Sequence, residues 1–474
     1  MVSVAKPSKT PPVYAAWENN TNPVWYKDPG LRKNTLFIVF LYLGTFVTGY
    51  DASYLNGLQA MPQWLEYFGN PTGSKLGLIN ACKYFPVLLI APLVALCVDK
   101  LGRRPAIWLG CTVITAGGFI GAFATGLPML YVGRVIVGAG NSFSNIGCVC
   151  LLNEITHPRL RSISSALYLT TFYVGSIASS WITFGTLKWD SEWSWRLPTL
   201  FQAFGPMILF VCTFFIPESP RWLIANGRPE QAQAILSRLH ANGAERDELV
   251  DNEMHEIQSA IEREKQTGSS WASLFSTPGN RRRVAVILIV ATGSQWNGIG
   301  ILSYYLSPVL RLAGITNPTE LAGINGGLAV FNLFIAMISA TLVERVGRRP
   351  LWIVSTAGML VGYIVITGIS GAFAEHGGKA TGLAVVPLIF ITYGFYDIAW
   401  SPLSYSYPIE VLPFSIRAKG MTLFVWTQQL SLAFNQWVNP VALKAIAWKY
   451  YFVYLATLVI YLTLILWLFV ETRC

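Results

Sequence analysis

The sequence predicts an all-α membrane protein in which twelve transmembrane helices form two six-helix halves. Three observations lead to this fold class. Of the 474 residues, 53% are hydrophobic and 12% are charged, about half the charged fraction of an ordinary soluble domain. Apolar runs long enough to cross a bilayer recur along the chain, and short charged motifs repeat at corresponding places in its two halves. This composition argues against a soluble enzyme, a disordered chain and a secreted disulfide scaffold.

Each predicted span is justified by its length and composition. A helix needs about 20 mostly apolar residues to cross a bilayer, and the frequent glycine and aromatic residues in these runs are typical of membrane helices. In chain order, the predicted spans are residues 36–56, 78–98, 106–125, 129–152, 163–186, 197–216, 284–308, 321–343, 351–373, 382–407, 420–442 and 450–470.

The segment before the first span, residues 1–34, is polar and rich in proline, which favours a tail outside the membrane over a cleavable signal peptide. With this tail in the cytoplasm, the cytoplasmic segments hold 25 lysine and arginine residues and the outer loops hold 7. Because basic residues concentrate on the cytoplasmic side, we expect both termini there. The same asymmetry accounts for the net charge of +10, so we expect no nucleic-acid partner.

The first half, residues 35–216, contains three charged residues within its spans. A charge at the bilayer centre costs about 2.5–3.5 kcal/mol, so Asp51 in the first span is expected to be paired or functional. Arg134 in the fourth span lies at a similar depth. Lys83 in the second span also lies at this depth, and its side chain has two alternative positions. It forms a permanent pair with Asp51, which hinders proton exchange, or its long side chain extends to the outer surface.

Between the two halves lies a polar linker, residues 217–283, which holds 19 of the 58 charged residues. Within it, residues 229–239 and 245–265 have the pattern of short helices with solvated faces. Two interpretations remain open: a connecting segment with surface helices, or an inner gate that seals the cytoplasmic mouth.

The second half, residues 284–474, repeats charged motifs of the first. The loop Asp99–Pro105 after the second span matches Glu344–Pro350 after the eighth, and both contain Gly-Arg-Arg-Pro. An acid stands seven residues before an arginine at the ends of the fourth and tenth spans alike. Parallel six-helix halves are typical of secondary transporters, which bind their substrate between the halves. Asp397, midway along the tenth span, is a further unusual charge whose partner the sequence does not identify.

The repeated arginines predict a gate. Guanidinium groups bind carboxylates and the negative C-terminal ends of helices, so this set can hold one conformation closed and must break in another. The alternative is a plain anchor of positive charge on the cytoplasmic side. The residues assigned to the cytoplasmic gate are Asp99, Arg103, Arg104, Glu154, Arg161, Glu218, Arg221, Glu344, Arg348, Arg349, Glu410 and Arg417.

Several motifs together resemble the sugar porter family of the major facilitator superfamily over residues 36–473, and most of all its fungal lactose permease, cellodextrin and hexose-transporter-like branch. The resemblance implies a twelve-helix transporter of the major facilitator fold in the plasma membrane. Such transporters work by alternating access, usually on sugars and often in symport with protons. The motifs are the two Gly-Arg-Arg-Pro loops, Gly133-Arg134, Pro217–Leu223, Ser294–Trp296, Ser303–Tyr305, Tyr405–Glu410 and Glu471-Thr472.

The resemblance also implies roles for individual residues. In the resembling symporters, the aspartate at the position of Asp51 takes the coupling proton and the arginine at the position of Arg134 modulates it; a static buried ion pair is the alternative. Their sugar-contacting residues are amides and aromatics, which suit a polyol, although hydrogen bonding between helices explains such residues equally well. The substrate-binding candidates here are Gln295, Asn297, Asn325, Tyr405, Gln428 and Gln429.

The chain departs from the family pattern within its fifth and seventh spans. Leu169 stands where members usually have an amide in the fifth span, and Ile299 and Gly300 stand where they have asparagine in the seventh; Asn297 is a candidate to supply the lost amide. Two hypotheses follow: a proton-coupled sugar transporter, or a transporter of another small molecule such as a polyol, a quinate-like acid or a secondary metabolite. A third is a non-transporting nutrient sensor. We expect no enzyme, no catalytic residue, no cofactor and no metal, because no such constellation is present.

Overall fold

The structure, a computed structural model, describes residues 17–22, 24–266 and 271–472, so most of the predicted tail lies outside the described residues. Within these ranges the chain is helical and has no strand. The first half and the linker contain η2 (Trp25–Lys27), α1 (Pro29–Leu58), α2 (Pro62–Tyr67), α3 (Ser74–Ala81), α4 (Tyr84–Lys100), α5 (Arg103–Ala122), α6 (Leu127–Ile155), α7 (Pro158–Thr186), α8 (Trp193–Thr213), α9 (Pro220–Ala225), α10 (Pro229–His240), α11 (Glu248–Gln266) and η3 (Trp271–Leu274).

The second half follows the same plan with more broken helices. Its seventh span is divided into three pieces and its tenth into two. The elements are α12 (Pro278–Trp296), α13 (Ile299–Tyr304), α14 (Leu306–Leu312), α15 (Pro318–Val346), α16 (Arg348–His376), α17 (Lys379–Leu383), α18 (Val385–Ala399), α19 (Leu403–Val411), α20 (Phe414–Ile446), η4 (Ala447–Tyr450) and α21 (Tyr451–Leu468).

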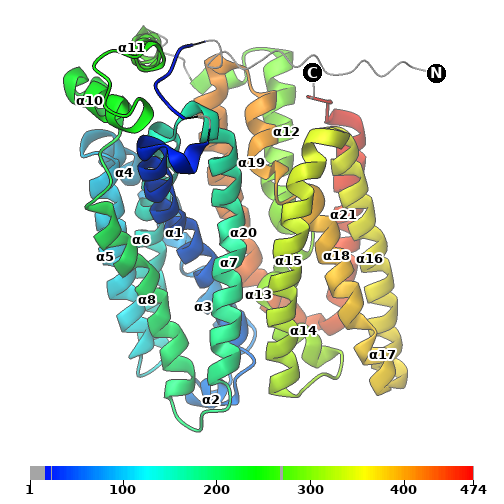
Figure 1. Ribbon diagram of the computed structural model, residues 1–474. Helices are drawn as coiled ribbons and strands as arrows, with labels where there is room; N and C mark the ends of the chain where they lie inside the picture. Colours follow the sequence, from blue (N-terminus) through cyan, green and yellow to red (C-terminus); the bar gives the residue numbers. More distant parts are fainter. Residues whose placement is uncertain (1–16, 23, 267–270, 473–474) are drawn as a thin grey trace.

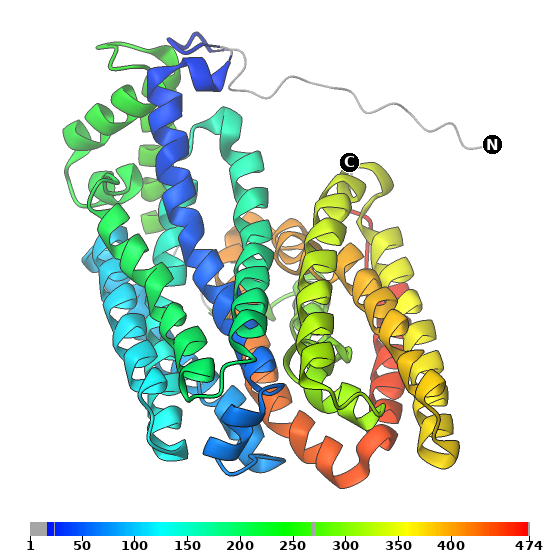
Figure 2. The ribbon, with the colours of Figure 1, turned by 60° about the horizontal axis from the view of Figure 1, so that its bottom comes forward.

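The long helices stand side by side in two groups, α1 to α8 in one and α12 to α21 in the other (Figures 1 and 2). The helices α10 and α11 lie over one end of the bundle, which we call the linker end (Figure 1). The short helices α2, α14 and α17 lie at the other end, which we call the hairpin end (Figure 1). Each predicted span therefore corresponds to one long helix or to one series of broken helices.

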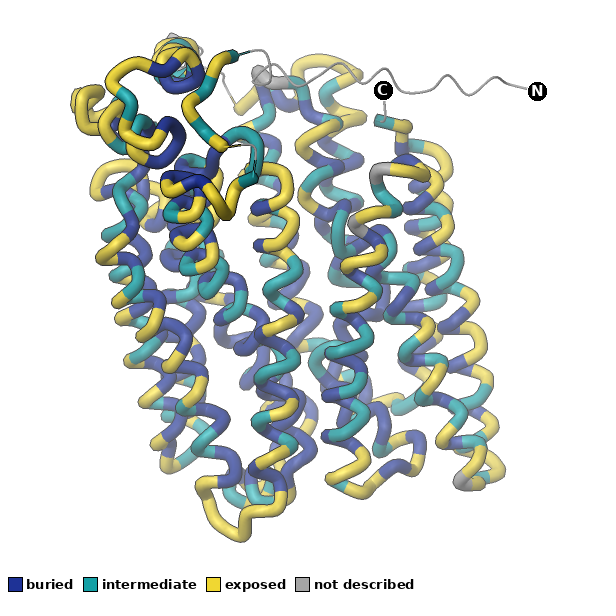
Figure 3. Tube along the Cα trace, in the orientation of Figure 1, coloured by how far each residue is buried: buried dark blue, intermediate teal, exposed yellow. Residues whose placement is uncertain are grey.

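Nine stretches of the described chain are long and apolar enough to cross a membrane, and one of them, Ile416–Leu468, covers the eleventh and twelfth spans together. The remaining two predicted spans, α7 and α12, are more polar for visible reasons: α7 contains many serine and threonine residues, and α12 begins with Arg281, Arg282 and Arg283. Large apolar side chains such as Leu89, Phe215 and Trp467 are 81%, 70% and 78% exposed. Exposed positions recur along the outer helices (Figure 3), as expected of surfaces that face lipid.

Glycine lets the helices of the first half touch backbone to backbone. A Cβ atom added to Gly49 of α1 would lie 1.9 Å from the Phe172 carbonyl oxygen of α7, and one added to Gly138 of α6 would lie 1.8 Å from the Lys83 carbonyl oxygen. In the second half such a backbone contact occurs at Gly382, where an added Cβ atom would lie 2.0 Å from the Ala313 carbonyl oxygen, but other glycines lie against side chains. Added Cβ atoms on Gly293 and Gly358 would meet aromatic rings rather than backbone.

The linker helices are attached to the end of α6 through buried histidines. His240 of α10 lies with its Nδ1 2.6 Å from Glu253 Oε2 of α11 and its Nε2 3.1 Å from the Ile155 carbonyl oxygen. The ring of His157, at the start of α7, packs against His240 with centroids 5.0 Å apart. Burial, together with His240 and nearby arginines, lowers the pKa of His157 to about 3, so this imidazole is neutral at physiological pH.

Candidate functional site

A buried cluster of charges joins four helices of the first half. Asp51 of α1 places its Oδ2 2.5 Å from Lys83 Nζ and its Oδ1 2.5 Å from Arg134 Nη1 of α6. Gln202 of α8 also donates to Oδ1 through its amide. All four residues are at most 5% exposed. Of the two alternatives for Lys83, the structure has the pair with Asp51.

Local backbone geometry brings these side chains together. Lys83 stands at the break between α3 and α4, and Gly138 of α6 lets the backbone approach at that break. Arg134 is held further by the Ile79 carbonyl oxygen at 3.3 Å and by the Tyr54 hydroxyl at 3.2 Å. Formally, one carboxylate faces two cations, so the cluster carries one surplus positive charge and both carboxylate oxygens are occupied.

A second buried carboxyl group joins the two halves. Tyr173 of α7 donates to Asp397 Oδ1 of α18 at 2.8 Å and is also hydrogen-bonded to Ser401 Oγ at 2.7 Å. Asp397 is 0% exposed, and its Oδ2 has no hydrogen-bond partner among the described residues. This carboxyl group therefore differs from Asp51, whose two oxygens are both bound to cations.

A chain of neutral polar groups crosses the middle of the second half. Tyr405 of α19 donates to Gln428 Oε1 of α20 at 2.7 Å, and Gln428 Nε2 donates to Ser294 Oγ of α12 at 3.2 Å. Gln295 Nε2 donates to the same serine oxygen at 3.2 Å. Tyr405 is 41% exposed. We call Ser294, Gln295, Tyr405 and Gln428 the polar cradle; it offers hydroxyl and amide groups to a ligand and contains no charge.

Three of the predicted substrate residues lie elsewhere. Asn297 is fully buried, and its side-chain oxygen accepts from the Ile299 N–H at 3.1 Å, in the turn between α12 and α13. Asn325 of α15 is engaged between the halves and donates to Ser180 at 3.1 Å. Gln429 is partly buried beside the cradle on α20.

The position of the expected asparagine in the seventh span is filled from another helix. Gly300 has no side chain, and a Cβ atom there would lie 2.3 Å from Asn435 Nδ2 of α20. Asn435 donates to the Gln295 carbonyl oxygen at 2.6 Å. An amide therefore occupies the space beside Gly300, although it belongs to α20 and not to the seventh span.

Hydrogen bonds join the two halves toward the hairpin end. Asn56 of α1 donates to Asn325 Oδ1 at 2.8 Å, accepts from the Leu306 N–H at 3.1 Å, and its carbonyl oxygen accepts from Ser307 at 3.2 Å. Nearby, Gln59 donates to the Tyr304 carbonyl oxygen at 3.0 Å. These contacts close the molecule at the hairpin end.

The ion pairs at the linker end occur twice, once in each half. Arg103 at the start of α5 binds Glu154 of α6 through two hydrogen bonds of 2.8 and 2.9 Å. At the equivalent place, Arg348 at the start of α16 lies 3.1 Å from Glu410 of α19. Both pairs lie within one half, so they brace each half rather than join the two.

A second acid caps each of these arginine-containing turns. Glu218 accepts from the N–H groups of Arg103 and Arg104 at 3.1 Å each. Glu471 accepts from those of Arg348 and Arg349 at 2.9 and 3.1 Å. A carboxylate at a helix N-terminus binds free N–H groups and the positive end of the helix dipole. The sequence motif contained Glu471, but only the structure assigns it this contact.

The other predicted gate residues are also at the linker end, and most of them bind backbone oxygens. Arg104 donates to the Phe214 carbonyl oxygen at 3.1 Å, and Arg161 lies 3.7 Å from Glu253. Arg349 and Arg417 donate to the Leu466 and Leu412 carbonyl oxygens, and the Asp99 carbonyl oxygen accepts from Trp222. Arg221 has a partner as well. The side chain of Glu344 lies outside the described residues.

Sequence reasoning missed Gln202, Asn56, Asn435 and Tyr173. All four are polar residues in predicted spans, which was the available signal, but their partners lie on other helices.

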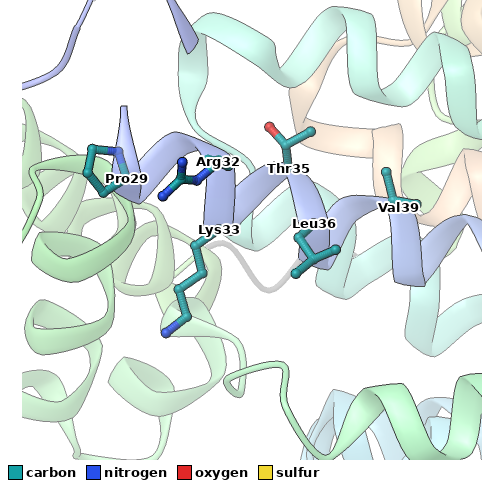
Figure 4. Close-up of a pocket in the computed structure, with 6 residues that line it drawn as sticks. All are labelled: Pro29, Arg32, Lys33, Thr35, Leu36 and Val39. Carbon is teal, nitrogen blue, oxygen red and sulfur yellow. The ribbon is translucent and has the colours of Figure 1, made fainter. Parts of the chain in front are cut away.

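A cavity of about 540 Å³ lies at the linker end, away from the cradle. The described residues that line it belong to α1 and include Arg32 and Lys33 (Figure 4). Among the described residues, no group of histidine, cysteine and acidic side chains could hold a metal ion.

The chain matches a family model, curated proteins and solved structures. The family model described as "Sugar (and other) transporter" matches residues 37–474. The MFS-type transporter oryC of Aspergillus oryzae is 29% identical over 90% of this chain and 80% of its own length. H(+)/hexose cotransporter 2 of Parachlorella kessleri is 26% identical over 87% of this chain and 80% of its own length. The xylose transporter XylE from E. coli, in an inward open conformation, superposes with a TM-score of 0.78 at 20% identity, covering 93% of this chain and 97% of that one.

Proposed function

The chain belongs to the sugar (and other) transporter family, and from this premise we propose that it moves a neutral polyhydroxylated molecule across a membrane by alternating access. The observation that supports this most directly is the polar cradle. Its hydroxyl and amide groups donate to and accept from substrate hydroxyls, and the Tyr405 ring offers a flat face to C–H groups.

The cradle favours a sugar or polyol over an organic acid. The hydrogen-bonding groups of Ser294, Gln295, Tyr405 and Gln428 are all neutral. A carboxylate substrate taken into a membrane protein needs a cation or a helix N-terminus to replace its hydration. Neither contributes to the cradle, so the quinate-like acid becomes the weaker of the two hypotheses.

The conformation fits one stage of the transport cycle. Asn56 and Gln59 hold the halves together toward the hairpin end, while the ion pairs of Arg103 and Arg348 at the linker end stay within their own halves. We infer that the linker end faces the cytoplasm, since Arg103, Arg348 and the nine lysine and arginine residues of the linker lie on that side, and that the membrane is the plasma membrane. The substrate path is then closed toward the outside.

The role of Asp51 changes once Lys83 is taken into account. We infer that the cluster of Asp51, Lys83 and Arg134 holds the helices of the first half together and keeps the carboxylate ionised. The proton-coupling role that the family resemblance implies for Asp51 needs a carboxylate that is free to take up a proton, and both of its oxygens are bound to cations.

Uptake of labelled D-glucose and D-xylose by transporter-deleted yeast tests the proposal. We expect saturable uptake of at least one sugar by the native chain, and its loss in Gln295→Ala at unchanged surface expression. Gln258→Ala, an exposed position on α11, is the matched control and should transport normally. Normal uptake by Gln295→Ala would remove the cradle from the substrate path. No uptake of these sugars or of polyols by a surface-expressed native chain would refute the proposed substrate class.

A further inference from the structure

The most unusual side chain outside the cradle is Asp397. It lies near the middle of the tenth span, fully buried, with one carboxyl oxygen bound to Tyr173 and the other without a partner among the described residues. A buried polar atom without a partner costs free energy, so such a group is retained for a reason. Asp397 also connects α18 of the second half to α7 of the first.

The surroundings of Asp397 contain no compensating positive charge. Among the described residues, no lysine, arginine or histidine forms an ion pair with it, and the ionisable side chains that interact with it are Tyr173, Tyr393 and Tyr396. Tyr304 of α13 interacts in turn with Tyr393 and Tyr396. The helices α15, α16 and α17 pack against α18, and α7 is hydrogen-bonded to it. These four helices carry charged residues only in their end turns: Arg159, Arg161, Glu320, Glu344, Arg345, Arg348, Arg349, Glu375, His376 and Lys379.

An isolated charge this deep in a membrane-spanning segment is unfavourable, because no water hydrates it. Asp51 avoids this cost through two cations. Asp397 has none, so in the present conformation the carboxyl group is stable when it carries a proton and unstable when ionised.

The contact between Asp397 and Tyr173 crosses the interface that alternating access must open. When the halves rock apart at the hairpin end, α7 and α18 separate and water from that side reaches the carboxyl group. Ionised Asp397 is then tolerated. Closure returns it to the dry interface, which requires the proton to be bound first. Protonation and closure of the hairpin end are therefore linked, because each favours the other.

The same broken helix connects this carboxyl group to the cradle. Asp397 is on α18 and Tyr405 is on α19, with the break at Trp400–Pro402 between them. Ser401 stands in that break and binds the Tyr173 hydroxyl that also binds Asp397. A change at Asp397 is thereby transmitted to the segment that positions Tyr405.

We propose that Asp397, rather than Asp51, binds the proton that is transported with the substrate. The carboxylate takes a proton from water while the hairpin end is open and releases it to water at the linker end, and no bond other than O–H forms or breaks. This inference rests on the proposed transport function and deepens it by naming the coupling group. Asp51 does not compete for this role, since its partners all belong to its own half and keep it charged.

The first experiment does not depend on the substrate. Spin labels at Glu66→Cys and Glu320→Cys, two exposed positions at the hairpin end of opposite halves, report closure as a distance in liposomes at pH 5 and pH 8. We expect the labelled protein to shift toward a shorter distance at pH 5, and the additional Asp397→Asn change to keep the short distance at both pH values. A pH-dependent shift that persists in the Asp397→Asn protein, or no shift in either, would overturn the proposal.

The second experiment measures labelled D-glucose and D-xylose transport in proteoliposomes. We expect Asp397→Asn to retain exchange of labelled for unlabelled sugar but to lose acceleration by an inward proton gradient, and Asp397→Glu to keep it. A gradient effect that survives in Asp397→Asn and disappears in Asp51→Asn would refute the assignment. If the native protein transports neither sugar, the proposed substrate class fails, while the distance measurement still decides the role of Asp397.

Discussion

Replacing Asp51 by asparagine is expected to destabilise the fold far more than replacing Lys83 by methionine. The asparagine variant keeps the side-chain volume but leaves Lys83 and Arg134 buried, with side chains 7% and 3% exposed, and without a counter-charge. Removing one partner of a buried ion pair costs about 3–5 kcal/mol. The methionine variant instead leaves Asp51 paired with Arg134 and Gln202 and removes the surplus cation. Its free energy of unfolding should change by about 1 kcal/mol or less, since apolar replacement of a buried charge is often neutral.

Unfolding of the purified protein in mixed detergent micelles, followed by tryptophan fluorescence, measures both changes on one scale. The double variant, Asp51→Asn with Lys83→Met, should recover part of the stability lost in Asp51→Asn, because it leaves a single unpaired cation in place of two. Equal losses in the two single variants, or no recovery in the double variant, would show that the cluster is not balanced as described.

Three further predictions concern the arginine-containing turn before α5, the hairpin end and the residue before α7. Gly102→Ala should lower the free energy of unfolding by about 1–3 kcal/mol, because Gly102 has a φ of +112° and an added Cβ atom would lie 2.6 Å from Glu218 Oε2. The control Gly185→Ala, which has open space around it, should be nearly neutral in the same unfolding assay. Asn56→Leu removes the two hydrogen bonds that the Asn56 side chain makes between the halves, each worth about 0.5–1.5 kcal/mol, so label distances at the hairpin end should lengthen. The pKa of His157 is about 3 in the folded protein, below its ordinary value of 6.5, so the free energy of unfolding should fall as the pH drops from about 6.5 toward 3. His157→Gln should reduce that fall. The same dependence of stability on acid pH in the variant and the native protein would contradict this prediction.

Apolar length was enough to predict the helices. Hydropathy along the chain records how each segment partitions into lipid, so the twelve spans could be inferred from it, while the repeated charged motifs indicated the two halves and the family. The family model and the structural match confirm the fold. Breaks inside the seventh and tenth spans were not predicted. They depend on local backbone geometry, such as the φ of +95° at Gly298, which leaves little trace in hydropathy.

The polar contacts were harder to predict, because a residue's partner depends on how each helix is rotated and packed. Sequence could place Asp51, Lys83 and Arg134 at one depth, but only the structure shows that Lys83 pairs with the carboxylate. The partner of Asp397 is on α7, more than 200 residues away in the chain. Asn435 fills the space beside Gly300 from another helix, a replacement that no pattern within the seventh span reveals.

The difference in packing between the halves has a consequence for how the sequence can vary. In the first half, Gly49 and Gly138 face carbonyl oxygens that cannot move without displacing a whole helix. In the second half, Gly293 and Gly358 face side-chain rings, which can shift without displacing the backbone of a whole helix. A saturation mutagenesis library selected for surface expression should therefore lose nearly every substitution at the first pair and retain small ones at the second.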